Sequence, residues 1–197
     1  MKTLVIYAHL LAACVSIGTL LLQDLALWRS RYRVLTQDEV VTLRNTATIV
    51  FIALLVLWAT GAGLVTMGYL EDPQAYFSNQ KIWAKFSVVI ILSLNGVFLH
   101  FYCFPKIVGN KAILQLPSLD QKWIGCSGAL STVSWLFACY LGIARTWNYS
   151  FDYSSIMLLY AGLVLFAFIV AHEVMRMSRT LLLTNLNMGE GADRDTV

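Results

Sequence analysis

The sequence predicts an all-α integral membrane protein, built as a bundle of five transmembrane helices. Of its 197 residues, 58% are hydrophobic and 13% are charged, and that charged fraction is about half of what a soluble domain usually carries. Five apolar runs are each long enough to cross a hydrocarbon layer of about 30 Å as a helix. These runs are residues 3–22, 48–70, 82–104, 127–143 and 156–174.

The polar stretches between the runs are no longer than loops, so they leave little room for a separate soluble domain. We therefore expect one transmembrane domain, residues 1–180, followed by a polar cytoplasmic tail, residues 181–197, which we expect to be disordered. The first run continues past Cys14 and is followed by three arginines. This pattern is typical of a retained membrane anchor rather than of a cleaved signal peptide.

The basic residues are distributed unevenly between the two sides of the predicted bundle. The N-terminus and the loops near 71–81 and 145–155 share one side, which has 4 of the 14 lysines and arginines. The other side has 10: Arg29, Arg31, Arg33, Arg44, Lys106, Lys111, Lys122, Arg176, Arg179 and Arg194. The positive-inside rule places this second side in the cytoplasm. We expect a multi-pass protein of a bacterial inner (plasma) membrane, with its N-terminus outside and its C-terminus inside, that contacts the lipid bilayer and no nucleic acid.

Local signals predict where two of the helices begin. Thr36 and Glu39 have the spacing of a capping box, which predicts that the second helix starts near Gln37. Ser118 and Gln121 have the same spacing, which predicts that the fourth helix starts near Leu119.

Polar and small residues form a stripe on each of two predicted helices. Steps of three and four residues keep side chains on one helix face. The stripe of the first helix comprises His9, Ala13, Ser16, Thr19 and Gln23, and that of the fourth comprises Ser127, Ser131, Ser134 and Ala138. Such stripes cannot face lipid, so we expect contacts between helices or, as an alternative, the lining of a polar cavity.

Ionisable side chains at membrane depth are the candidate functional residues, because burying them there is costly. The topology places His9 and Lys85 together in the outer half and His100 and His172 in the inner half. Two histidines on different helices suit a b-type haem, or alternatively copper. We therefore predict cofactor binding by His9, His100 and His172 and a metal site at His100 and His172, with Met175 as a further soft ligand. The structural alternatives are hydrogen-bonded caps or headgroup contacts for His100 and His172 and a snorkelling Lys85.

Other kinds of site have no matching pattern in the sequence. It has no glycine-rich phosphate loop and no HExxH motif. The four cysteines are far apart and show no metal or redox spacing. Catalysis of the kind found in soluble hydrolases is therefore not expected.

Two segments, YAHLL at residues 7–11 and NQKIWAKF at residues 79–86, resemble an uncharacterised family of predicted bacterial inner-membrane proteins with A-H-L-L and W-A-K motifs. More distantly, they resemble the CopD copper-resistance proteins and the HemJ-type protoporphyrinogen oxidases. The resemblance covers about residues 1–110. It implies functional roles for His9 and Lys85, which we treat as candidate catalytic residues, and an association with haem.

The leading functional hypothesis is a haem- or metal-associated membrane protein with an oxidoreductase role. One alternative is a small transport or export protein, which would need to act as a homodimer or larger oligomer because five helices are few for a transporter. The other is a structural or assembly subunit of a larger membrane complex.

Overall fold

The protein is an all-α bundle in which five helices are long and apolar enough to cross a membrane, counted within the described residues. The computed structural model describes the backbone of residues 2–194, and the side chains of these residues except 75, 77, 182, 183 and 185–194. The long helices are α1 (Lys2–Ser30), α2 (Gln37–Glu71), α4 (Gln80–Phe98), α6 (Ser118–Ile143) and α7 (Tyr153–Arg194). The predicted fold class is therefore confirmed.

Short helical segments connect or extend the long ones. Helix α3 (Pro73–Ser78) turns the chain from α2 into α4. The π-helical segment η1 (Leu99–Cys103) and helix α5 (Phe104–Ile107) prolong α4. Two 3₁₀ turns, η2 (Ile113–Gln115) and η3 (Arg145–Trp147), precede and follow α6.

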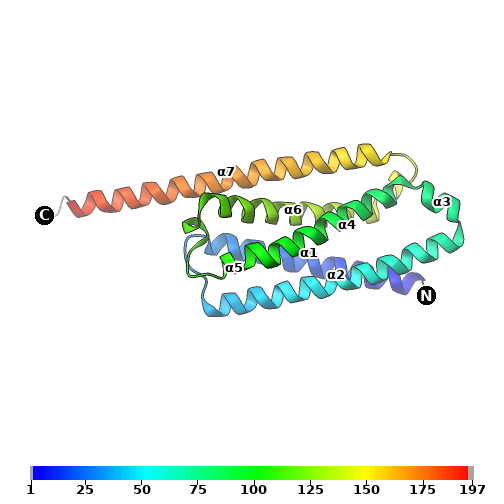
Figure 1. The fold of residues 1–197 in the computed structure, drawn as a ribbon, viewed down its shortest axis with the longest axis horizontal. Helices are drawn as coiled ribbons and strands as arrows, with labels where there is room; N and C mark the ends of the chain where they lie inside the picture. Colours follow the sequence, from blue (N-terminus) through cyan, green and yellow to red (C-terminus); the bar gives the residue numbers. More distant parts are fainter. Residues whose placement is uncertain (1, 195–197) are drawn as a thin grey trace.

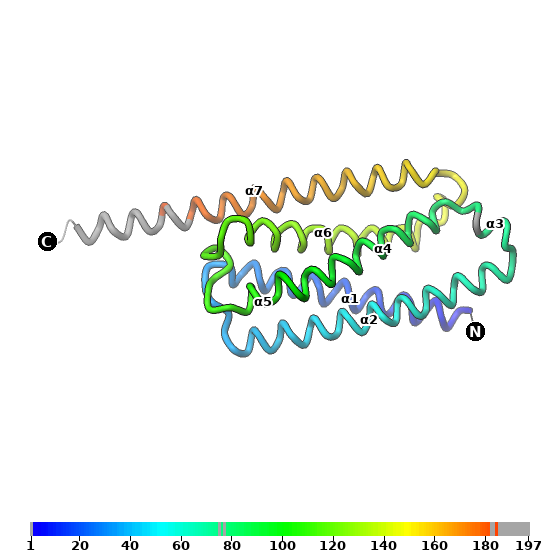
Figure 2. Tube along the Cα trace, viewed as in Figure 1, coloured from blue at the N-terminus to red at the C-terminus, as the bar shows by residue number. Residues whose placement is uncertain are grey.

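The helices pack in a simple order. Helix α1 packs mainly against α2, α4 against α6, and α6 against α7. Figure 1 shows α7 along one side of the bundle, α2 along the opposite side, and α1, α4 and α6 between them. The trace in Figure 2 follows the same antiparallel course from one end to the other. The loops thus group at two ends as the topology prediction requires.

Apolar cores join the helices in layers, while many large apolar side chains remain on the outer surface. One core cluster contains Ala84, Val88, Phe137, Leu141, Ile156 and Tyr160, from α4, α6 and α7. Outward-facing residues such as Leu94, Leu158 and Phe166 are 65–75% exposed. An apolar exterior over the length of five helices fits a lipid solvent, so the chain is a multi-pass membrane protein.

Both predicted helix starts lie within one residue of those observed, Gln37 for α2 and Ser118 for α6, but only one of the two capping boxes forms. Thr36 caps α2 with the full capping box, since its hydroxyl accepts from Glu39 N and the Glu39 carboxylate accepts from Thr36 N. At α6 the predicted box is wrong. Pro117 is the cap residue, without a side-chain cap, and the Gln121 amide instead donates to the carbonyls of Leu114 and Leu116. These two carbonyls belong to the turn before α6, and the Gln121 side chain forms hydrogen bonds with them instead of with the cap residue.

Two expected boundaries also differ. We expected a loop to begin at Pro105, but α5 continues the helix to Ile107. Pro105 has no N–H to donate to the carbonyl four residues before it, and the preceding turn is a π-helix. The backbone of α7 extends to Arg194, past the start of the tail that we expected to be disordered. Residues 195–197 of that tail lie outside the described residues.

Candidate functional site

The candidate site, in the half of the bundle that holds the N-terminus, is organised around His9 on α1. The imidazole is half-buried, and its Nδ1 lies 2.8 Å from Thr60 Oγ1 on α2. Thr60 Oγ1 also lies 2.6 Å from the Val56 carbonyl oxygen, one turn earlier in α2. The hydroxyl proton is therefore donated to that carbonyl, and the hydroxyl oxygen accepts from His9 Nδ1–H.

This hydrogen-bond order fixes which ring nitrogen can bind a ligand. A neutral imidazole carries one proton, and here the proton is on Nδ1. The lone pair of Nε2 is then free to accept a hydrogen bond or to ligate a metal. Histidines that ligate metals typically donate their other N–H in this way.

Lys85 on α4 lies in the same part of the bundle. It is partly buried and lies near His9 of α1. A Cβ added to Gly142 would lie 3.6 Å from Lys85 Nζ, so this part of α6 presents small residues to the amine. His9 and Lys85 lie in the same half of the bundle, as expected from the sequence, and the assignment of that half to the outer side stays a prediction.

Lys81, one turn before Lys85, has a structural role that sequence reasoning missed. It is 8% exposed and donates from Nζ to the carbonyl oxygen of Ala144 at 2.9 Å. Ala144 is the C-cap residue of α6, and lysine side chains commonly satisfy carbonyls at that end of a helix. The sequence signal was only the position of Lys81 at the start of an apolar run.

His100 lies on η1 and is exposed. Its ring centroid is 5.1 Å from that of Phe101 and 6.1 Å from that of Phe104, both neighbours in sequence. These contacts suit a side chain at the surface of the bundle.

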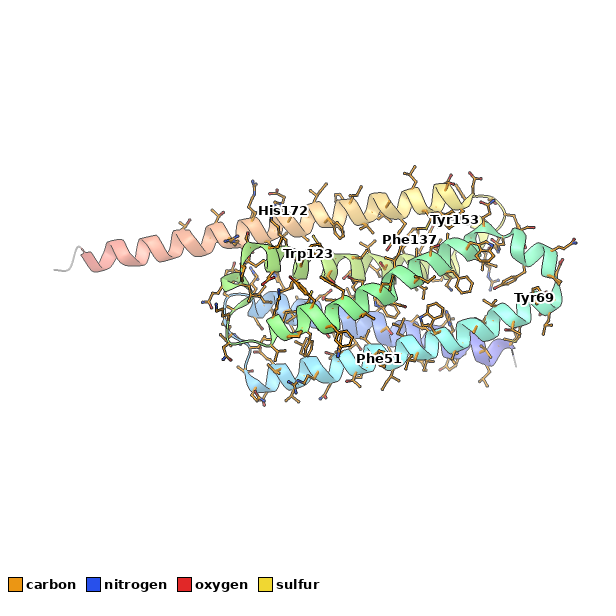
Figure 3. All side chains as sticks on the ribbon, in the orientation of Figure 1. Phe51, Tyr69, Trp123, Phe137, Tyr153 and His172 are labelled. Atoms are coloured by element: carbon orange, nitrogen blue, oxygen red, sulfur yellow. The ribbon has the colours of Figure 1, made fainter. Side chains whose placement is uncertain are left out.

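His172 lies on α7 and its side chain is 50% exposed, with Nδ1 3.6 Å from Glu173 Oε1. Figure 3 shows His172 on α7, on the far side of α6 from α2. It lines a cavity between α6 and α7 together with Met175, and His100 is not among the lining residues. The two histidines do not line this cavity together, and a shared site at His100 and His172 stays a prediction.

The polar stripes make contacts between helices. Ser127, Ser131 and Ser134 are each at most 4% exposed. Ser127 Oγ donates to Asn95 Oδ1 at 2.7 Å, and Ser134 Oγ lies 2.7 Å from the Tyr160 hydroxyl. On α1, Gln23 Oε1 accepts from Thr46 on α2 at 2.7 Å. The expected helix contacts are confirmed, whereas a transport path along these stripes stays a prediction.

Sequence reasoning did not single out two further polar residues at membrane depth. Asn95 on α4 is 6% exposed and also donates from Nδ2 to the Ser127 carbonyl oxygen at 2.9 Å. Asp24 on α1 accepts from Thr132 Oγ1 on α6 at 2.9 Å. The sequence signal for Asn95 was an amide side chain inside an apolar run. No sequence signal pointed to Asp24, because it follows the first apolar run and was expected to lie in a loop.

No group of three His, Cys, Asp or Glu side chains in the described part of the chain could hold a metal ion. Comparison with protein-family models, curated proteins and solved structures finds no match for the chain. The resemblance to inner-membrane, CopD and HemJ-type families therefore stays a prediction.

Proposed function

We propose that this multi-pass membrane protein binds a b-type haem through His9 and has a redox role in the membrane. The observation that carries the proposal is the hydrogen bond from His9 Nδ1 to Thr60, 2.8 Å long. It holds the ring in the tautomer in which Nε2 is a ligand. This bond lies at membrane depth, where an imidazole without a function is a costly residue to keep.

The set of donors near His9 favours haem over copper. A protein copper site needs several side-chain ligands, and no His, Cys, Asp and Glu group of that size lies among the described residues. A haem has four ring nitrogens of its own, so the protein would need to supply as little as one imidazole. His9 alone meets that need.

The chain's own residues have distinct parts in this proposal. His9 binds through Nε2, and Thr60 orients the ring by accepting from Nδ1. Lys85 offers a positive charge to an anionic group, such as a haem propionate, in a region of low dielectric where that charge acts strongly. The bound haem supplies one-electron transfer. Its redox partner and its substrate are not part of the proposal.

The test is the visible absorption spectrum of the protein purified from haem-replete cells. We expect a Soret band that is lost in His9→Gly and restored when imidazole is added to that variant. Thr60→Val should lower haem affinity about tenfold, since loss of such a supporting hydrogen bond costs 10–100-fold. His172→Ala is the matched control, because its ring lies at the exposed surface of α7, and it should keep the band.

Two results would overturn the proposal. One is a colourless wild-type preparation that elutes as a folded protein and takes up no added haem. The other is a Soret band that His9→Gly leaves unchanged while His100→Ala or His172→Ala removes it. The second result would move the site to the inner half of the bundle.

A further inference from the structure

A basic cavity lies between α6 and α7 at the end of the bundle that carries most of the arginines. It has a volume of about 270 Å³. Three cationic side chains line it, Lys122 from α6 and Arg176 and Arg179 from α7. Neither the fold nor the proposed haem site uses this cavity.

One of the three cations, Arg176, has an acidic partner, and that partner stands outside the cavity. Arg176 Nη2 pairs with Glu173 Oε2 at 2.8 Å, but Glu173 does not line the cavity. The nearest acid on α6, Asp120, pairs with Lys106 and also stands outside the lining. The lining thus has two guanidinium groups and one ammonium group, against no carboxylate among its described residues.

One of the guanidinium groups is already positioned. Arg179 Nη1 donates to Ser118 Oγ, the first residue of α6, at 3.1 Å. This bond holds the end of Arg179 over the start of α6 and leaves its other N–H groups available. Guanidinium groups bind phosphate oxygens through paired N–H donors, so this geometry favours a phosphate.

The deeper part of the cavity is apolar. Met175 packs there against α6, with its Cε and Cγ 3.8 Å from where a Cβ on Gly125 would lie. Ala171 and Cys126 also line this part. Because α6 begins and the apolar part of α7 ends at this level, the cations stand where lipid headgroups lie and the apolar part points towards the acyl chains.

We propose that this cavity binds the phosphate of an anionic phospholipid, with Lys122, Arg176 and Arg179 contacting the headgroup. Basic pockets between transmembrane helices bind anionic headgroups in this way. The apolar floor distinguishes a lipid from a free phosphate ion, because only the lipid has chains to place on Met175 and Gly125. The site is independent of haem binding by His9.

The test uses the full chain, delipidated in detergent and titrated with phosphatidylglycerol, with bound lipid counted by native mass spectrometry. We expect wild type to bind phosphatidylglycerol at least tenfold more tightly than phosphatidylcholine. Lys122→Gln combined with Arg179→Gln should abolish that preference. Arg44→Gln is the matched control, since Arg44 is an exposed arginine on the same side of the bundle but on α2, and it should change affinity less than twofold.

Three outcomes would overturn this proposal. The double variant could retain the preference for phosphatidylglycerol. Arg44→Gln could weaken binding as much as the double variant does, which would indicate attraction by overall charge. Inorganic phosphate at millimolar concentration could displace the lipid fully, which would indicate a site for the free ion. Haem content, measured on the same samples, should be unchanged in each variant.

Discussion

Several polar side chains inside this bundle form hydrogen bonds with residues of neighbouring helices. Asn95 is the clearest case, since its amide exchanges two hydrogen bonds with Ser127, at 2.7 and 2.9 Å. Lipid offers neither donors nor acceptors, so a side chain of this kind must meet its partner within the protein. Such residues therefore fix which faces of two helices meet.

We expect Asn95→Ala to lower the free energy of unfolding by about 1–2 kcal/mol. Hydrogen bonds between transmembrane helices contribute on average about 0.6 kcal/mol and at most about 1.7, and this variant removes two. Unfolding in mixed detergent micelles, followed by circular dichroism, measures the change.

Thr66→Ala is the control for Asn95→Ala. The Thr66 hydroxyl is exposed and donates to the Ala62 carbonyl oxygen of its own helix, so its removal should cost less than about 0.5 kcal/mol. Equal effects of the two variants would show that the Asn95–Ser127 pair does not hold α4 against α6.

The residue scale also shows where sequence reasoning stopped. The hydroxyl stripe on α6 could be predicted because its spacing is regular, and its contact role was confirmed. Its partners, Asn95 and Tyr160, come from α4 and α7, and nothing in the spacing of one helix identifies residues on another. For the same reason the Thr60 partner of His9 was not predicted.

At the scale of elements, the corner between α2 and α3 depends on a glycine. A Cβ on Gly68 would collide with the Tyr76 ring, which packs back on α2 from α3. Burial raises the pKa of the Tyr76 hydroxyl above its usual value, which agrees with a ring packed into this corner. The close approach of the Tyr76 ring to Gly68 determines how tightly the chain turns from α2 through α3 into α4.

We expect Gly68→Ala to lower the free energy of unfolding by about 1–3 kcal/mol, the usual cost of overpacking. In a Tyr76→Ala background the same substitution should cost nothing, because the colliding ring is gone. A double-mutant cycle in detergent measures this coupling.

Gly162→Ala is the matched control for the corner. Gly162 has no heavy atom within 4 Å of an added Cβ, so alanine should stabilise α7 by up to about 1 kcal/mol through helix propensity. Destabilisation by Gly68→Ala that persists without the Tyr76 ring would mean that the backbone, and not this contact, requires the glycine.

Elements were predictable to the extent that their signals are local. The capping box of α2 lies within four consecutive residues, from Thr36 to Glu39, and the cap that it predicts was confirmed. The equivalent pattern at Ser118 failed because Gln121 bonds carbonyls of the preceding turn. The π-helical segment before Pro105 was not predicted, although a proline near a helix end was the available signal.

For the whole molecule, the orientation in the membrane follows from the charge distribution and is a prediction. The two ends of the bundle differ in arginine and lysine content, and the loops meet at those ends as expected. Lys2 pairs with Glu71 at one end, and Arg31 donates to Ser178 at the other. Each contact joins segments that were assigned to the same side.

We expect a membrane-impermeant maleimide to label Gln74→Cys in spheroplasts and to label Lys111→Cys only after the membrane is permeabilised. Both positions are exposed and lie in connections at opposite ends of the bundle. Wild type, which keeps its four cysteines, gives the background. The reverse labelling pattern would place the N-terminus in the cytoplasm.

The bond between Arg31 and Ser178 joins residues 147 positions apart, and so it has a consequence for biosynthesis. A ribosome completes the first helix long before it reaches the last one. Until Ser178 emerges, the Arg31 end of α1 cannot make its final contact. A nascent chain arrested before that point would therefore be an incompletely packed bundle. It would be accessible to membrane proteases and to chaperones that bind newly inserted helices.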